Sequence, residues 1–185
     1  MERVSLRGLY ISELKKSHDV EIQLISALET AAQASSSVEL RQTFEHHLEQ
    51  TKDHATRLQM ILEMTGETPQ VSPSVAMKGL TADLKQLQQQ GLADGVLDSA
   101  LIAHARRIEH YEIAMYGTLH NYATALGECD TASQLQTTLE EEQEADRQFT
   151  KIGQTINREL AAKDAGEPSQ PCPEAETTTR IKPAA

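Results

Sequence analysis

The chain has 185 residues, of which 17 are Lys or Arg and 28 are Asp or Glu, so its formal net charge is −11. A chain of this length can form one domain with a buried core. The acidic balance argues against nucleic acid or an anionic membrane as a partner, because contacts with phosphate need clustered basic residues.

Ala, Leu, Glu, Gln and Lys dominate the sequence, and these residue types favour helix. Apolar residues three and four apart predict a first long helix over residues 5–34 and a second over residues 37–65. Ser36 or Ser37 can cap the start of the second helix, and Gly66 can end it in a left-handed conformation. The break between the two helices is short, which predicts an antiparallel hairpin.

A long crossover follows, and within it the sequence predicts a short helix over residues 75–90. Two further long helices are predicted over residues 94–126 and 131–162. Asp94 can cap the first of them, Gly127 can end it, and the short turn between them predicts a second hairpin. We therefore expect an all-α fold: a four-helix bundle of two antiparallel hairpins, joined by a long crossover that carries a short extra helix.

The composition changes at Lys163, where Pro, Thr, Glu and Ala replace the apolar period. This predicts one helical bundle over residues 1–162 and a disordered tail over residues 163–185. Cys129 and Cys172 have no CxxC partner, so a disulfide or a zinc finger is a poor interpretation. The N-terminus lacks the pattern of a signal peptide and no apolar run is long enough for a membrane span, so we expect a cytoplasmic protein.

Polar residues on the apolar faces of the first two helices are the first candidates for a functional site. A helix turns by about 100° per residue, which places each side chain relative to the apolar stripe of its helix. Glu21 falls at the centre of the first stripe, and His18 lies one turn earlier on the same face. His47 and His54 lie together on the flank of the second stripe.

The third and fourth long helices also carry polar residues on their apolar faces. Glu112 lies within the third stripe and Glu109 on its edge. His104 lies inside the same stripe, two turns from Glu112, and is better interpreted as a core histidine. Glu142 and Asp146 lie inside the fourth stripe, one turn apart.

The depth of these residues along each hairpin gives a second test. Folding the first hairpin about residue 36 brings Glu21 level with residue 51, between the two histidines of the second helix. Folding the second hairpin about residues 129–130 brings Glu112 level with residue 147, next to Asp146. The polar residues of each hairpin therefore form one layer.

Burying several carboxylates is costly unless they are protonated, paired or bound to metal, and no Lys or Arg is expected to face this layer. The four carboxylates Glu21, Glu112, Glu142 and Asp146, with two or three imidazoles and with Glu109 as a further candidate, supply the ligands of a two-metal site. Iron or manganese suits these ligands, and zinc stays open. The predicted ligands are Glu21, His47, His54, Glu109, Glu112, Glu142, Asp146 and His18.

Simpler interpretations stand beside this one. The inward carboxylates can be edge residues that pair with solvent, and His47 and His54 can be satisfied histidines on the flank of the helix. Glu109 is equally a ligand, a hydrogen-bond acceptor for a ligand or a solvated residue. His18 is a ligand or only a hydrogen-bond partner of a carboxylate.

Several short stretches of the chain resemble the YciE/YciF ferritin-like family of bacterial stress proteins, also called DUF892. The resemblance covers residues 6–156, and its most specific piece is the run EHYEIAMYG that begins at Glu109. The other matching stretches are VEIQL from Val20, FEHHLEQT from Phe44, AMKGL from Ala76 and TLEEE from Thr138, with Asp146. The resemblance implies a ferritin-like bundle, a homodimer, a role in stress response and a di-iron or di-manganese site.

The chain departs from this family at several of these positions. His18 stands where the family often has Tyr, Gln50 where Glu is frequent, and His54 where Gln is frequent. Ser74 replaces a frequent Cys. No Glu-x-x-His motif of the usual ferritin type occurs in the sequence, so the second helix loses a carboxylate and gains an imidazole.

Two functions follow as hypotheses. In the first, the protein is an oxidoreductase with two metal ions per chain that oxidises iron or consumes peroxide. Glu21 and Glu112 are then the candidates to bridge the ions. In the second, it is a non-catalytic helical dimer that acts in stress response through a partner, and its metal site is vestigial or structural.

Overall fold

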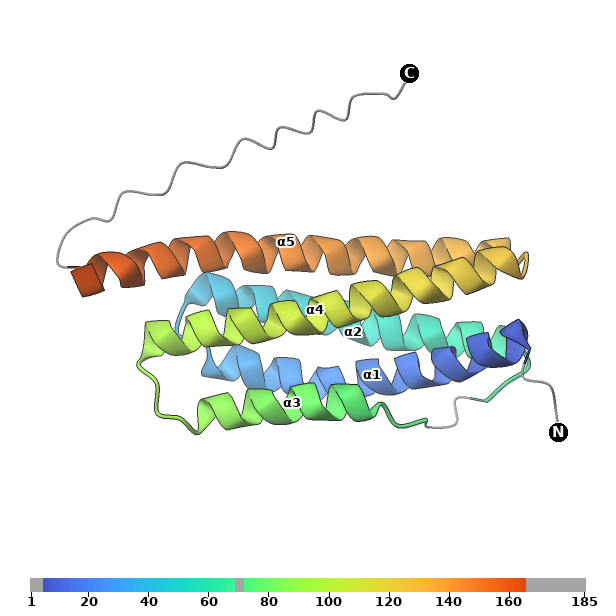
Figure 1. Cartoon of the computed structure of the whole chain (residues 1–185), viewed down its shortest axis with the longest axis horizontal. Helices are drawn as coiled ribbons and strands as arrows, with labels where there is room; N and C mark the ends of the chain where they lie inside the picture. Colours follow the sequence, from blue (N-terminus) through green and yellow to red (C-terminus); the bar gives the residue numbers. More distant parts are fainter. Residues whose placement is uncertain (1–4, 69–71, 166–185) are drawn as a thin grey trace, which may run out of the picture.

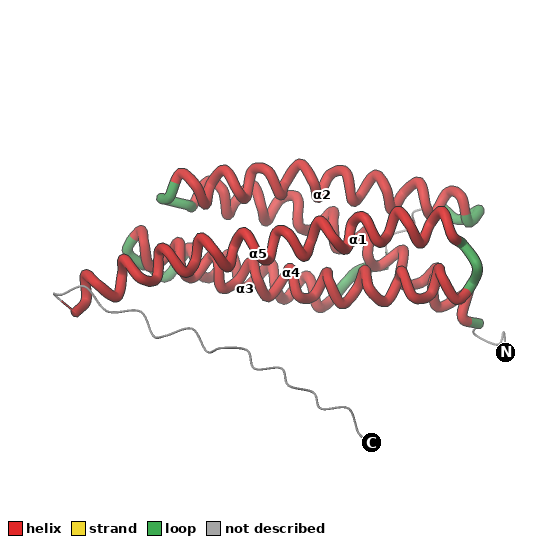
Figure 2. Tube along the Cα trace, turned by 90° about the horizontal axis from the view of Figure 1, so that it is seen from above, coloured by secondary structure: helices red, strands yellow, loops and turns green. Residues whose placement is uncertain are grey.

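The computed structural model describes residues 5–68 and 72–165, and these form five helices. The helices are α1 (Leu6–Ala34), α2 (Val38–Met64), α3 (Val75–Gln88), α4 (Asp94–Ala125) and α5 (Cys129–Ala165). The first two form one antiparallel hairpin, the last two form a second, and the crossover carries α3 alongside α1 and α4 (Figure 1). The view turned by 90° shows all five helices along one long axis (Figure 2). Neither described range contains a strand, so the predicted all-α arrangement is confirmed.

Serine side chains fix the starts of three helices. The Oγ atoms of Ser5, Ser37 and Ser74 accept hydrogen bonds from backbone N–H groups in the first turns of α1, α2 and α3. Each bond satisfies a donor that has no partner within its helix. The predicted cap at Asp94 is wrong, because Ala93 occupies the cap position of α4 without a side-chain bond. Asp94 lies instead in the first turn, where its charge favours the positive end of the helix dipole.

Two glycines end helices as the sequence predicts. Gly66 follows α2 with φ 79° and Gly127 follows α4 with φ 75°, a left-handed conformation that costs glycine little. After Gly127, the N–H of Glu128 donates to the carbonyl of Ala123 at 2.9 Å, and the N–H of Gly127 donates to Thr124 at 3.1 Å. This pair of bonds is the Schellman ending, and it makes the turn into α5 short.

The last helix is longer than the sequence suggests at both ends. α5 begins at Cys129 and continues through Ala165, so the predicted start of a disordered tail at Lys163 is wrong. Lys163 lies in the last turn, where a positive charge favours the helix dipole. The rest of that predicted tail, residues 166–185, lies outside the described residues.

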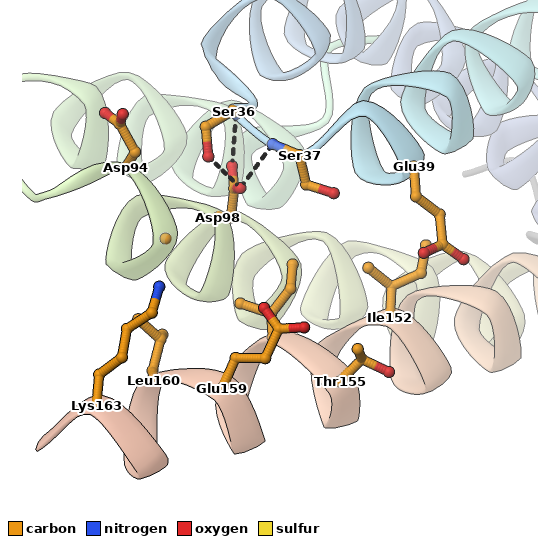
Figure 3. Close-up of a pocket in the computed structure, with 12 residues that line it drawn as sticks. Ser36, Ser37, Glu39, Asp94, Asp98, Ile152, Thr155, Glu159, Leu160 and Lys163 are labelled. Atoms are coloured by element: carbon orange, nitrogen blue, oxygen red, sulfur yellow. Dashed lines mark hydrogen bonds between the residues drawn. The ribbon is translucent and has the colours of Figure 1, made fainter. Parts of the chain in front are cut away.

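A buried carboxylate fastens the loop between α1 and α2 to the start of α4. Asp98 is 2% exposed. Its oxygens accept hydrogen bonds from the N–H of Ser36 at 2.9 Å, the Oγ of Ser36 at 2.6 Å and the N–H of Ser37 at 2.9 Å (Figure 3). The contact satisfies backbone donors at the start of α2 and joins the two hairpins at one end of the bundle.

The apolar core is divided in two along the bundle axis. One cluster is built around Leu24, Phe44, Leu101 and Phe149, and the other around Tyr10, Leu58, Tyr116 and Leu135. On every long helix, the residues of the two clusters lie on opposite sides of a short segment with buried polar side chains. The fold therefore places one polar layer across the middle of the bundle, as the depth argument predicts.

Candidate metal centre

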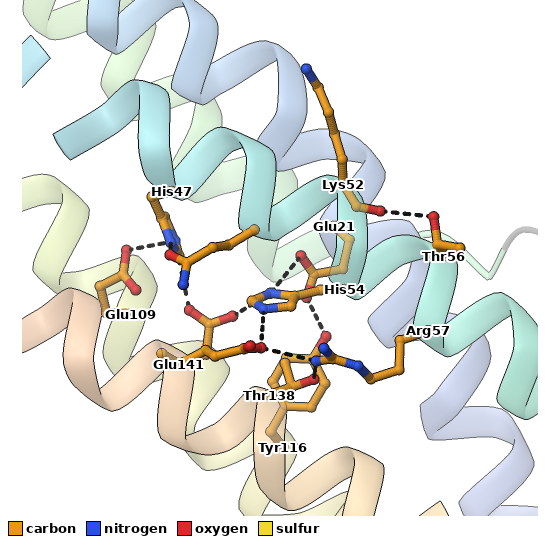
Figure 4. Close-up of polar contacts among 12 residues, drawn as sticks. Glu21, His47, Lys52, His54, Thr56, Arg57, Glu109, Tyr116, Thr138 and Glu141 are labelled. Atoms are coloured by element: carbon orange, nitrogen blue, oxygen red, sulfur yellow. Dashed lines mark hydrogen bonds and ion pairs between the residues drawn. The ribbon is translucent and has the colours of Figure 1, made fainter. Parts of the chain in front are cut away.

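The polar layer brings together side chains from all four long helices. Its members share nearly complete burial, at most 2% exposed: Glu21 from α1, His47 and His54 from α2, Glu109 and Glu112 from α4, and Glu142 from α5. Their ligand atoms form two groups, each with all atoms within 4.8 Å of one another. Figure 4 shows the histidines pointing into the space between the helices.

The first group contains His47, Glu109, Glu112 and Glu142. The Nε2 atom of His47 lies 3.3 Å from Glu109 Oε1 and 3.6 Å from Glu142 Oε2. On the other edge of the ring, Nδ1 faces the side-chain oxygen of Gln50 at 3.5 Å. This group therefore offers one imidazole and three carboxylates.

The second group contains Glu21, His54 and Glu142, so Glu142 belongs to both. The Nδ1 atom of His54 lies 2.9 Å from Glu142 Oε1 and 3.9 Å from Glu21 Oε2. The hydroxyl of Tyr116 donates a hydrogen bond to Glu21 Oε1 and leaves Oε2 turned toward the histidine. The two groups thus share one carboxylate but differ in the number of ligands.

Many of these buried atoms have no hydrogen-bond partner among the described residues. They include both oxygens of Glu112, both of Glu142, Oε2 of Glu21, Oε2 of Glu109 and Nδ1 of His54. The close pair His54 Nδ1 and Glu142 Oε1 is 2.9 Å apart but lacks the geometry of a hydrogen bond. With bonds of about 2.1 Å, neighbouring ligands of one ion lie roughly 3.0 to 3.5 Å apart. The separations given above, 2.9 to 3.9 Å, extend on both sides of this range. The donor set is therefore compatible with bound metal ions.

Burial dominates the electrostatics of the carboxyls. It raises the pKa of Glu21 and of Glu109 to about 7, although the nearby imidazoles oppose the rise. Burial, together with the charges of Glu142 and Glu21, raises the pKa of Glu112 well above its ordinary value. Without a cation, the layer therefore holds protons that solvent-exposed carboxyls would release at neutral pH.

The histidines and Glu142 form the charged part of the layer. Burial alone would lower the pKa of His47, but the charge and hydrogen bond of Glu109 raise it to about 10. The nearby charge of Glu142 raises the pKa of His54 against the effect of burial. Burial also disfavours the charged form of Glu142, yet the two imidazoles lower its pKa.

Two of the predicted ligands lie outside both groups. Asp146 is partly exposed and pairs with Arg106 Nε at 2.8 Å. Folding this hairpin about residues 129–130, as predicted from the sequence, brings residue 147 level with Glu112. In the structure, α4 ends at Ala125 and α5 begins at Cys129, so the turn lies earlier in the chain. The residue level with Glu112 therefore lies about one helical turn before Asp146, where Glu142 stands.

The other residue outside the groups is His18, which is half-buried, while its neighbour Ser17 takes the inward position on α1. His104, interpreted from the sequence as a core histidine, is buried, and its Nε2–H donates to the carbonyl of Leu80 at 2.7 Å. This bond packs α4 against α3 and leaves His104 outside the two groups.

The sequence argument missed two charged residues beside the layer. From the sequence alone, Glu141 has no predicted role and no Lys or Arg is expected to face this layer. Instead, Arg57 Nη1 lies 2.9 Å from Glu141 Oε2, and His54 Nε2 lies 2.9 Å from the same oxygen (Figure 4). Both residues sit where α2 meets α5, a contact that spacing along one helix does not reveal.

Comparisons with known proteins identify relatives of this chain. Residues 5–162 match the family model described as "Domain of unknown function (DUF892)". The chain is 35% identical over 153 residues to protein YciF of Escherichia coli strain K12, across 82% of this chain and 92% of that protein.

Solved structures agree with this relationship. The crystal structure of the E. coli stress protein YciF matches with a TM-score of 0.80 at 34% identity, over 84% of this chain and 98% of that one. The YcfI protein of Rhodopseudomonas palustris matches with a TM-score of 0.77 at 30% identity, over 81% and 97%. A dodecameric thioferritin of Bacteroides fragilis, a bacterioferritin-related protein, matches with a TM-score of 0.64 at 16% identity, over 88% and 91%. The ferritin-like fold is thereby confirmed.

Proposed function

The chain belongs to the DUF892 family, and from this premise we propose that it is a ferritin-like stress-response protein whose polar layer holds two metal ions. The observation that carries the proposal is the set of buried carboxylate and imidazole atoms without hydrogen-bond partners. A buried polar atom left unpaired costs about 1 to 3 kcal/mol, and more when it is charged. Metal ions would satisfy these atoms together.

The two ligand groups suggest which residues would hold each ion. His47, Glu109 and Glu112 would hold one ion, Glu21 and His54 would hold the other, and Glu142 would be common to both. Hard oxygen donors with imidazole suit iron or manganese, and zinc stays possible for this donor set. Bound iron or manganese would supply redox chemistry with oxygen or peroxide, as in iron oxidation or peroxide removal.

The chain's own residues prepare this environment in two ways. The apolar clusters above and below the layer shield it from water, which strengthens every charge interaction within it. Tyr116 is fully buried, and its hydroxyl holds Glu21 by one oxygen, so the other oxygen faces the layer. Such outer hydrogen bonds orient a ligand before any ion arrives.

The role in stress response is supported by the relative in E. coli, which is described as a stress protein. A homodimer, and a cytoplasmic location, are further proposals that the sequence supports. Among the helices within residues 5–68 and 72–165, none combines the length and apolar character that crossing a membrane requires.

Metal analysis tests the proposal directly. The protein, purified after growth with iron and manganese, is expected to contain about two ions per chain by elemental analysis. Glu112→Gln should lower this content, because it replaces a ligand oxygen by an amide without changing the size of the side chain. Glu140→Gln, on the exposed face of α5, is the matched control and should leave the content unchanged. Less than one ion per chain, with no uptake on reconstitution, would reject the proposal.

A second candidate is the non-catalytic stress protein with a structural or vestigial site. Its support is the pairing of His47 with Glu109 and Glu142, which lets the layer partly neutralise itself without an ion. Peroxide consumption by the metal-loaded protein separates the two candidates. Turnover that disappears in Glu112→Gln favours the oxidoreductase, whereas full metal occupancy without turnover favours the structural role.

A further inference from the structure

His54 lies between two carboxylates on opposite edges of its ring. Nδ1 faces the polar layer, 2.9 Å from Glu142, and Nε2 faces the α2–α5 surface, 2.9 Å from Glu141. The imidazole is completely buried, while the side chain of Glu141 is 31% exposed. The ring therefore connects a surface carboxylate with the interior of the layer (Figure 4).

Glu141 is itself held in place. Arg57 Nη1 donates to Glu141 Oε2 at 2.9 Å and also donates to the hydroxyl of Thr138. Arg57 follows His54 by three residues on α2, and Thr138 precedes Glu141 by three residues on α5. The four side chains thus form a polar bridge across the contact of these two helices, directly outside the second ligand group.

We infer that Glu141 is a positioning residue, which accepts the Nε2–H of His54 and so presents the Nδ1 lone pair to an ion between Glu21 and Glu142. The inference rests on the proposed function, and it concerns the ligand group with three members. Nε2 forms a hydrogen bond with Glu141, whereas the contact of Nδ1 with Glu142 lacks the geometry of one. A carboxylate accepts hydrogen bonds and donates none, so the proton of a neutral imidazole belongs on Nε2. Such an outer carboxylate also makes the opposite nitrogen a stronger ligand.

The two histidines differ in this respect. His47 turns Nε2 toward the layer, and its Nδ1 has only the Gln50 amide oxygen at 3.5 Å. His54 turns Nδ1 toward the layer and has a charged acceptor at 2.9 Å behind it. His47, in the group with four ligands, therefore has a weak hydrogen-bond acceptor behind its ring. His54, in the group with three ligands, has a strong one. Loss of Glu141 should consequently affect one ion and spare the other.

Calorimetric titration of the metal-free protein with Mn²⁺ tests this expectation. Glu141→Ala should lower the affinity for the ion held by Glu21, His54 and Glu142 by about 10- to 100-fold, since loss of an outer hydrogen-bond partner has that effect on metal affinity. The affinity for the ion of the four-ligand group should stay within about twofold of the wild-type value. Glu141→Gln keeps an acceptor oxygen and should lie between the wild type and Glu141→Ala. Glu140→Ala, one residue earlier and exposed, is the control and should bind as the wild type does. The inference is overturned if Glu141→Ala lowers the affinity for both ions equally, or for neither.

A second measurement does not depend on metal. In nitrogen-15 NMR spectra of the metal-free protein, the Nε2–H of His54 should give a slowly exchanging signal, because it is buried and bonded to Glu141. Glu141→Ala should abolish that signal while the far-UV circular dichroism stays unchanged. A signal that survives in Glu141→Ala overturns the inference. If the wild type shows the signal but binds no ion, the proposed function fails while the positioning of His54 stands.

Discussion

At the scale of single residues, Glu142 has a place that no other side chain in residues 5–68 and 72–165 shares. It belongs to both ligand groups, and its two oxygens face different histidines: Oε2 lies 3.6 Å from His47 and Oε1 lies 2.9 Å from His54. The sequence favoured Glu21 and Glu112 as bridging residues, each of which the structure places in one group. The shared position falls instead to the carboxylate of α5.

The shared position predicts a difference in metal content between two variants. Glu142→Ala should reduce the content below that of Glu21→Ala, because it removes a ligand from both ions. Glu21→Ala should leave about one ion, held by the four-ligand group. Elemental analysis after dialysis gives the comparison. Equal contents in the two variants would contradict the assignment of Glu142 to both ions.

His104 predicts how stability depends on pH. Burial lowers the pKa of this histidine, although its bond to the carbonyl of Leu80 opposes that change. The unfolded chain therefore takes up a proton near the ordinary pKa of about 6.5, while the folded protein does not, so stability falls as the pH drops through this value.

The test of His104 is urea unfolding of the wild type and His104→Gln at pH 7.5 and 5.5. Glutamine keeps a donor for Leu80 but cannot titrate, so the variant should lose less stability between the two pH values. The comparison is made on metal-free protein, which excludes effects of ion release. An equal loss in both proteins would show that His104 is not responsible.

At the scale of the elements, the contacts between helices decide how far a sequence argument reaches. The hairpins and their turns were predictable because apolar spacing, serine caps and Gly66 and Gly127 are local signals. Five of the six residues of the layer, all except Glu109, were placed inward or on the flank of a stripe by the same spacing. Glu109 was placed only at the edge of its stripe, yet it is 1% exposed because α2 and α5 pack over it.

The differences from the sequence analysis arise where two helices must be aligned or packed. Asp146, which the sequence places inside the stripe of its helix and level with Glu112, lies outside both ligand groups, because α5 begins earlier than predicted and brings Glu142 to that level. Arg57 and Glu141 escaped notice because each lies on the flank of its own helix and meets the other only across the α2–α5 contact. Periodicity gives the face of one helix and does not give the residue that stands opposite.

Because Asp98 holds the α1–α2 loop against α4, replacing it should lower the stability of the protein strongly. Asp98→Ala removes three hydrogen bonds to a carboxylate that is 2% exposed, and it takes the protein partner from the donors of Ser36 and Ser37. We expect a loss of about 2 to 4 kcal/mol in the free energy of unfolding, measured in urea. Glu159→Gln, an exposed residue at the same end of the bundle, is the control and should change stability by less than about 0.5 kcal/mol.

At the scale of the whole molecule, the polar layer joins the two hairpins. Glu21, His47 and His54 come from the first hairpin, whereas Glu109, Glu112 and Glu142 come from the second. Each ligand group draws on both, so an ion in either group would tie the hairpins together. Stability and metal binding are then linked properties of one layer.

This linkage predicts a rise in the melting temperature. At a free Mn²⁺ concentration of about 100 times the dissociation constant, binding at one site adds about 2.7 kcal/mol to the free energy of unfolding. For a chain of this size, that corresponds to a rise of roughly 5 to 10 °C in Tm. The rise should be much smaller in Glu142→Ala at the same concentration. An unchanged Tm in wild-type protein that calorimetry shows to be saturated would refute the linkage.

The position of α3 makes the two open sides of the bundle unequal. α3 covers the side where α1 meets α4, and its partner His104 helps to hold it there. No described helix covers the side where α2 meets α5, and there the side chains of Arg57 and Glu141 are 21% and 31% exposed. The α1–α4 side of the bundle is therefore covered, and the α2–α5 side is the one on which we expect ions to enter and leave the layer. Substitutions along the α2–α5 contact should change the rate of ion exchange, whereas substitutions on the outer face of α3 should not.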